Sequence, residues 1–168
     1  MAVEAGSTVT LRGNDIYSLP LLEYRKDVQS FPQNSYIFSG TTRSYLDPYK
    51  SHSDVKMNNV LQELHQALRN EDSGRINLDF TIISGSSTHL LTHSITLTHS
   101  GCDNLSAGEK QTLALAKAAL STASIVILDE ITSEMDETVS VQAMNILKRE
   151  LVGEGKAVLL ISHRINDF

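Results

Sequence analysis

Two carboxylates, Asp129 and Glu130, stand directly after the apolar run of residues 125–128. Branched apolar residues that end abruptly in charge predict a central strand of a parallel sheet, buried on both faces. Ligands of such sheets bind beyond the carboxyl ends of the strands, where Asp129 could hold Mg²⁺ and Glu130 could polarise a water that attacks a γ-phosphate. Solvated residues opening a loop would give the same pair, so this segment alone leaves both interpretations open.

A candidate phosphate-facing group lies upstream, at Ser106 and Glu109. The pair has the S-x-x-E spacing of a capping box, in which each side chain accepts a hydrogen bond from a backbone N–H at the start of a helix. The alanine- and leucine-rich residues that follow predict that this helix runs to about Leu120. The positive end of its dipole suits an anion, and Gly108 has no side chain to block close approach. An ordinary capped helix has the same sequence pattern.

These groups need elements that bring them together. After the carboxylates, the sequence predicts a helix over about residues 137–151 and a second apolar strand over residues 157–162. Strand, helix and strand form one right-handed βαβ unit, so the two strand ends should be neighbours. His163 follows the second strand and is therefore expected beside Asp129 and Glu130, in reach of a γ-phosphate. A lone histidine is otherwise most often structural.

Composition fits one incomplete α/β domain. The chain has 168 residues, 40% hydrophobic content and a net charge of −6, enough for a core but without the basic stripe of a general nucleic-acid binder. No transmembrane span or secretory signal is visible, and the single cysteine, Cys102, cannot form an internal disulfide. We therefore expect a cytosolic, reducing setting, with membrane attachment supplied by a partner domain.

The middle of the chain combines one clear helix with one irregular stretch. Residues 54–70 carry apolar side chains at helical spacing, which predicts an amphipathic helix packed on the core. Residues 81–100 are crowded with Ser, Thr and His, and we expect an irregular or partly extended insertion there. A zinc site would need His89, His93, His99 and Cys102. The β-branched, hydroxyl-rich surroundings disfavour the helix that such ligation requires, so a surface loop is the preferred interpretation.

Taken together, these segments resemble the nucleotide-binding domain of ATP-binding cassette (ABC) proteins. The family's Leu-Ser-Gly-Gly-Gln signature corresponds to Leu105, Ser106, Ala107, Gly108 and Glu109, with Ala107 for the first Gly and Glu109 for Gln. The other matching segments are the Walker B strand at residues 125–129, Glu130 as catalytic glutamate, the D-loop from Ser133 to Asp136, His163 as switch histidine, and Gln33 in the Q-loop.

This resemblance implies a fold, cofactors and partners. The fold is an α/β, P-loop NTPase-like cassette with a parallel sheet and helices plus a small helical subdomain. ATP and Mg²⁺ are the implied cofactors, with Glu130, His163 and Gln33 catalytic and with Asp129 and Gln33 near the metal. The implied partners are ABC transmembrane domains and a second nucleotide-binding domain with an intact P-loop, on whose ATP the signature acts in trans.

A finer resemblance is to the multidrug-resistance-associated, or C, subfamily, which exports organic anions and conjugates. It is carried by residues 37–41 and 46–48, which look like the segment after the Q-loop in that subfamily. The second cassette of these proteins keeps the catalytic glutamate and tolerates a replaced first signature glycine, the combination seen at Glu130 and Ala107. Several residues resemble those of fungal proteins, which implies the vacuolar membrane as the location. The chain is expected on the cytosolic face of that membrane.

One family motif is missing, the P-loop G-x-x-x-x-G-K-[ST] that wraps the β-phosphate in backbone N–H groups. Residues 153–157 lack its first glycine and its hydroxyl residue, and they are better interpreted as a helix end and turn. Residues 7–12 are expected to form a strand and residues 13–14 its turn, matching the family segment just after the P-loop helix. The chain is therefore expected to be an N-terminally truncated cassette.

In that cassette, residues 1–40 and 104–168 would form the α/β core and residues 41–103 the helical subdomain. Losing the P-loop strand should leave the strand at 125–129 without a central neighbour. The expected function is that of a nucleotide-binding domain fragment of an exporter, inactive alone because its catalytic residues lack a triphosphate anchor. The alternative is a non-catalytic relic or interaction module that supplies a signature in trans. A soluble translation-factor or DNA-repair cassette would need a coiled-coil arm or a basic face, and neither is visible.

Overall fold

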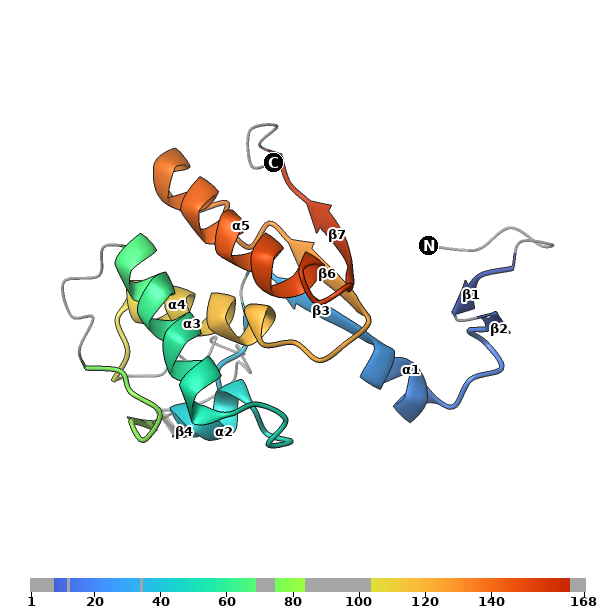
Figure 1. Ribbon diagram of the computed structural model, residues 1–168, viewed down its shortest axis with the longest axis horizontal. Helices are drawn as coiled ribbons and strands as arrows, with labels where there is room; N and C mark the ends of the chain where they lie inside the picture. The colour runs from blue at the N-terminus through green and yellow to red at the C-terminus, as the bar shows by residue number, and fades with distance from the viewer. Residues whose placement is uncertain (1–7, 12, 34, 69–74, 84–103, 164–168) are drawn as a thin grey trace, which may run out of the picture.

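A parallel sheet of three strands forms the centre of the chain, in a computed structural model that describes residues 8–11, 13–33, 35–68, 75–83 and 104–163. Its strands are β3 (Val28–Pro32), β6 (Ile125–Asp129) and β7 (Ala157–Ile161), in the order β3-β6-β7 (Figure 1). Pro32, Asp129 and Ile161 are in register, so all three strands end at the same edge. The predicted α/β fold with a parallel sheet is confirmed.

Three helices begin and end close to the predicted residues. α4 covers Ala107–Ala119, α5 covers Glu137–Val152, and α3 covers Asp54–Ala67, which is slightly shorter than predicted. Each begins after a side chain that accepts a backbone N–H, namely Ser53, Ser106 or Asp136. Among the helices of the described residues, none combines the length and the apolar composition that crossing a bilayer requires.

Short elements complete the fold. β1 (Thr10–Leu11) and β2 (Asn14–Asp15) form an antiparallel hairpin, and Gly13 has a φ of +81° in the predicted turn. Three further elements are not apparent from the sequence: α1 (Leu21–Asp27), β4 (Gly40–Thr41) and α2 (Thr42–Leu46). The expected insertion begins as β5 (Thr81–Ile82), which pairs with β4, and residues 84–103 lie outside the described residues.

The middle strand, β6, is better paired than expected. It pairs with β3 along one edge and with β7 along the other, so the expectation that it lacks a central neighbour is wrong. The crossover through α5 brings β7 to that side of β6. Within the described residues, β7 is paired only with β6, so the open edge lies one strand further out than expected.

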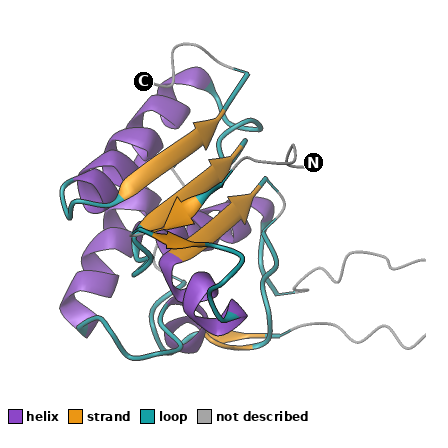
Figure 2. Cartoon of the chain, turned by 90° about the vertical axis from the view of Figure 1, so that its right-hand side faces the viewer, coloured by secondary structure: helices purple, strands orange, loops and turns teal. Residues whose placement is uncertain are grey.

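The two faces of the sheet differ in burial. Val126 and Leu128 point to one face and are 0% exposed, whereas Leu159 and Ile161 on the opposite face are 54% and 46% exposed. Figures 1 and 2 show α3, α4 and α5 on one side of the strands. The prediction that residues 125–129 are buried on both faces is wrong, because Ile125 and Ile127, on the face that these helices do not cover, are only half-buried.

One hydrophobic core joins α3 to α4 and α5. Leu61 and Leu64 of α3 are 2% and 0% exposed, and Leu113 of α4 and Leu147 of α5 are 0% and 1% exposed. All four belong to one cluster of buried side chains, and α3 contacts both other helices. The predicted inward-packing face of α3 is confirmed.

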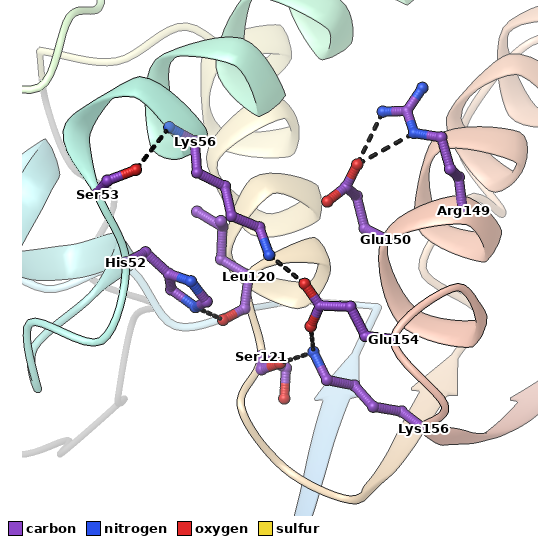
Figure 3. A network of polar contacts seen from close by, with 9 residues as sticks. All are labelled: His52, Ser53, Lys56, Leu120, Ser121, Arg149, Glu150, Glu154 and Lys156. Atoms are coloured by element: carbon purple, nitrogen blue, oxygen red, sulfur yellow. Dashed lines mark hydrogen bonds and ion pairs between the residues drawn. The ribbon is translucent and has the colours of Figure 1, made fainter.

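A polar network ties α3 to the turn before β7 and to the segment after α4 (Figure 3). Lys56 of α3 forms an ion pair with Glu154, and Lys156 Nζ lies 2.7 Å from Glu154 Oε2. Lys156 also donates a hydrogen bond to the carbonyl oxygen of Ser121. Hydrogen bonds from Lys156 and Lys56 lower the pKa of Glu154 to about 2, so this carboxylate is ionised at neutral pH.

Candidate functional site

The ends of the three strands bring the predicted site residues to one edge of the sheet. The last residues of β3, β6 and β7 are in register, and Gln33, Glu130 and His163 come one or two residues later. His163 Nε2 lies 2.8 Å from Glu130 Oε1, and Asp129 is the last residue of β6. The structure therefore places these four residues at the same edge of the sheet, which we call the strand-end site.

Glu130 has an unusual backbone conformation. Its φ is 51°, in the left-handed region, where a residue with a β-carbon is strained by about 1 kcal/mol. Its N–H still donates to the carbonyl oxygen of Ile161 at 2.9 Å, which fixes the chain as it leaves the sheet. The side chains of Glu130 and His163 are 27% and 88% exposed, so both are accessible to a ligand. Strain of this kind is concentrated at functional sites in proteins.

The D-loop segment folds tightly between this site and α5. The Ser133 N–H donates to the Glu130 carbonyl oxygen at 3.0 Å. Asp136 then caps α5 by accepting a hydrogen bond from the Thr138 N–H at 2.9 Å. Ser133 and Asp136 thus fix the path of the chain from Glu130 to α5.

Gln33 faces this segment across the edge of the sheet. Its Nε2 lies 3.4 Å from Glu134 Oε1, a long contact. The amide oxygen of Gln33 and the carboxylate of Asp129 are ligands of the type that Mg²⁺ prefers, and Mg²⁺ commonly takes its remaining oxygens from phosphate and water. The donor set fits such an ion. Across the described residues, no cluster of three or more acidic, His or Cys side chains is arranged to hold a metal by itself.

The zinc hypothesis concerns a different segment. His89, His93, His99 and Cys102 all lie outside the described residues.

The signature turn, residues 104–109, presents a second candidate surface. Both halves of the capping box are present: the Ser106 N–H donates to Glu109 Oε2 at 2.7 Å, and the Glu109 N–H donates to Ser106 Oγ at 3.2 Å. Leu105 is 7% exposed and packs in the core, whereas Ser106 and Ala107 are exposed and Gly108 is half-buried. The start of α4, with its positive dipole end, is therefore open to an anion.

Arg75 contacts this turn through Glu109, and the sequence did not reveal this pairing. Its Nε lies 2.8 Å from Glu109 Oε1 and its Nη2 lies 2.5 Å from Glu109 Oε2. Burial raises the pKa of Glu109, but hydrogen bonds from Arg75 and Ser106 outweigh burial and hold that pKa below its ordinary value. A buried carboxylate requires a cation, and this was the available signal. Arg75 and Glu109 are 34 residues apart in sequence, which hid the identity of that cation.

Lys117 is a second residue whose contacts are not apparent from the sequence. Its Nζ lies 4.6 Å from the centre of the Phe38 ring and 4.2 Å from the centre of the Tyr45 ring. Burial lowers the pKa of Lys117, and the two ring faces attract the ammonium group. This contact joins α4 to α2 and to the segment that follows Gln33.

Comparisons with known proteins agree with this geometry. The family model described as ABC transporter matches residues 2–133. Multidrug resistance protein fer6 of Mycosarcoma maydis is 34% identical over 161 residues, which cover 96% of this chain and 10% of fer6. ATP-binding cassette sub-family C member 2 of Rattus norvegicus is 30% identical over 162 residues, which cover 96% of this chain and 9% of that protein. The chain thus spans about a tenth of the length of the curated relatives it matches.

A solved structure supports the fold. A bacterial Atm1-family ABC exporter with ATP bound superposes with a TM-score of 0.67 at 18% identity, over 95% of this chain and 25% of that chain. At this identity, the likeness concerns the fold alone. The family match over residues 2–133 shows that this chain belongs to the ABC transporter family.

Proposed function

We propose that this chain is part of the nucleotide-binding domain of an ABC exporter, which couples ATP binding and hydrolysis to transport of organic anions or conjugates. The observation that carries the proposal is the 2.8 Å contact between His163 and Glu130 at the ends of adjacent strands, beside Asp129. Residues 1–40 and 104–168 are assigned to the α/β core and 41–103 to the helical subdomain.

Each polar group of the strand-end site has a proposed role. Bound MgATP supplies the phosphoryl group and the metal charge. Asp129 and Gln33 would hold Mg²⁺. Glu130, whose backbone is left-handed directly after β6, would polarise the attacking water. His163 would contact the γ-phosphate while its Nε2 stays in reach of Glu130. Ser133 and Asp136 would carry changes at this site into α5.

Membership of the ABC transporter family supports a proposal for the partners and the location of the chain. ABC transmembrane domains would supply the membrane attachment and the transport path. We place the chain on the cytosolic face of a membrane, with the vacuolar membrane as the specific proposal. The similarity to the rat relative, ATP-binding cassette sub-family C member 2, supports the C-subfamily assignment on which the proposed organic-anion substrate class rests.

We propose that this chain contributes its signature turn to the ATP site of a second cassette. The 168 residues contain no G-x-x-x-x-G-K-[ST] segment to anchor a triphosphate. Ser106 and Gly108, at the exposed start of α4, would instead close over ATP that the P-loop of a second cassette holds. The alternative, an interaction module without a role in hydrolysis, is favoured by the same missing motif.

Phosphate release from MgATP tests the proposal. The purified chain alone should give no turnover, and a P-loop-bearing ABC cassette should gain activity when the chain is added. Gly108→Asp should abolish the gain, because it sets a carboxylate against the phosphates, yet it should still fold, since acidic residues are favourable at a helix start. Thr122→Asp, in the exposed loop after α4, is the matched control.

Three results would contradict this assignment. Robust turnover by the isolated chain that Glu130→Gln abolishes would show a complete site within it. Binding to the cassette that needs no ATP and is unaffected by Gly108→Asp would favour the interaction module. Failure of the chain to stimulate or bind any P-loop-bearing cassette would remove the donor role.

A further inference from the structure

Arg75 joins two sides of the signature turn. Its Nη2 lies 2.8 Å from the carbonyl oxygen of Asn104, before the turn, and 2.5 Å from Glu109 Oε2, inside α4. Its Nε adds a second bond to Glu109, at 2.8 Å from Oε1. One guanidinium group therefore bridges both ends of residues 104–109, with the two-pronged geometry that arginine forms and lysine cannot.

Glu109 depends on this bridge. Its side chain is 1% exposed, and its two oxygens receive three donors: Nε and Nη2 of Arg75 and the N–H of Ser106. An ionised carboxylate is stable out of water only with such partners. Without Arg75, the carboxylate would keep the Ser106 N–H but would have no cation to neutralise it. Its charge would lie directly beneath the start of α4 and would oppose an approaching phosphate.

Arg75 and Asn104 are themselves anchored to neighbouring structure. The guanidinium carbon of Arg75 lies 5.5 Å from the centre of the Phe80 ring. The side chain of Asn104 pairs with β5 and the residue after it: Nδ2 donates to the Thr81 carbonyl oxygen at 2.7 Å, and Oδ1 accepts from the Ile83 N–H at 3.0 Å. Residues 75–83 thus form several hydrogen bonds with the turn.

We propose that Arg75 is a positioning residue for the signature turn: it fixes residues 104–109 so that Ser106 and the start of α4 face a nucleotide, and it neutralises Glu109 beneath them. This inference rests on the proposed donor role of the signature. Arg75 lies outside all of the family motifs that were identified in the sequence. It also explains how a charged Glu109 is compatible with phosphate binding.

Hydrogen exchange of the chain alone tests the positioning directly. Arg75→Gln should speed amide exchange across residues 104–110 about tenfold, because the turn loses its bridge and retains a buried charge. Arg75→Gln combined with Glu109→Gln should restore slow exchange, since a neutral glutamine at position 109 can still cap the helix without a cation. Arg25→Gln, at an exposed position on α1, is the matched control and should change nothing.

The ATP dependence of binding to a P-loop-bearing cassette gives the functional readout. Arg75→Gln should raise the half-saturating MgATP concentration about tenfold, and the double variant should return it to within about twofold of the original value. Arg75→Lys should lie between them, because an ammonium group keeps the charge but makes only one of the two parallel bonds.

The two proposals fail in different ways. Unchanged exchange in Arg75→Gln, or a double variant as loose as the single one, overturns the positioning role whatever the binding assay shows. Exchange that follows the expected pattern while ATP affinity stays constant also overturns it, because Arg75 would then be merely structural. A chain that binds no cassette at all, while exchange responds as expected, removes the proposed donor function, and with it the phosphate-facing purpose assigned to the turn.

Discussion

The signature turn is more firmly held than the strand-end site formed by Gln33, Asp129, Glu130 and His163. Glu109 is 1% exposed and receives three hydrogen bonds, and the turn is anchored to the core below by Leu105. At the strand-end site, the His163 side chain is 88% exposed, and its Nε2 lies 2.8 Å from Glu130 Oε1. The one surface is already organised, whereas the other consists of accessible polar groups at the end of a sheet.

This difference bears on the proposed donor role of the signature. A surface that closes over a nucleotide held elsewhere must be rigid before contact, since ordering it afterwards would reduce affinity. Groups that hold a metal and a phosphate must stay accessible until the ligand arrives. The contrast therefore favours a donor role for the signature, and the following predictions test it by comparing the two regions.

The largest effect is expected in the core below the signature turn. Leu113, one turn into α4, is 0% exposed, and Leu113→Ala should lower the free energy of unfolding by about 3 kcal/mol through a cavity. Leu22→Ala on α1, where the side chain is 74% exposed, should change it by less than about 0.5 kcal/mol. Urea unfolding measures both. Equal effects would mean that the core does not support the turn.

The next effect concerns the cap of the signature helix. Ser106→Ala removes the acceptor of the Glu109 N–H and should cost about 1 kcal/mol in urea unfolding. Ser39→Ala, at an exposed position outside the helices, should be close to neutral. A neutral Ser106→Ala would show that the capping box does not stabilise the turn.

A smaller effect is expected at the opposite end of α4, where Glu154 holds Lys56 and Lys156. The folded-state pKa of Glu154 is about 2, below its ordinary 4.5, so the stabilisation is present above pH 4.5 and is lost as the pH falls toward 2. Because the carboxylate is 41% exposed and screened by water, Glu154→Gln should cost less than about 1 kcal/mol at pH 7.

Two measurements check this electrostatic contribution. The difference in unfolding free energy between the original chain and Glu154→Gln should disappear near pH 2, and it should shrink in molar salt. A difference that persists under both conditions would point to packing instead of charge.

The smallest effect is expected at the strand-end site. His163→Ala should leave the free energy of unfolding within about 0.5 kcal/mol, because its imidazole is almost fully exposed. Lys148→Ala, at an exposed position of α5, is the control. A large loss of stability in His163→Ala would show that the contact with Glu130 supports the fold, and the contrast between the two regions would weaken.

Local patterns were enough to predict much of this molecule. The capping box at Ser106, the periodicity of α3 and α5, and the apolar runs of β6 and β7 all come from short-range chemistry, and the βαβ rule placed His163 near Glu130. Gln33 reached the same edge because β3 lies in register with β6. Its place had rested on the family resemblance alone.

What the sequence did not show depends on distant partners. Arg75 and Glu109 are 34 residues apart, and no periodicity links them. Helix α1 has Leu21 and Leu22 60% and 74% exposed, so it has no buried stripe by which to recognise it. The exposure of Leu159 and Ile161 was likewise hidden, because an apolar strand looks the same whether helices cover one of its faces or both.

The uncovered face of the sheet also determines how the molecule must be handled at the bench. Leu159 and Ile161 form a water-exposed strip on β7, a strand that pairs on one side only within the described residues. Two copies that meet there would exclude water from this strip and extend the sheet. Self-association should therefore increase steeply with protein concentration. Enzymatic and binding assays are therefore best run dilute, with light scattering monitored in parallel.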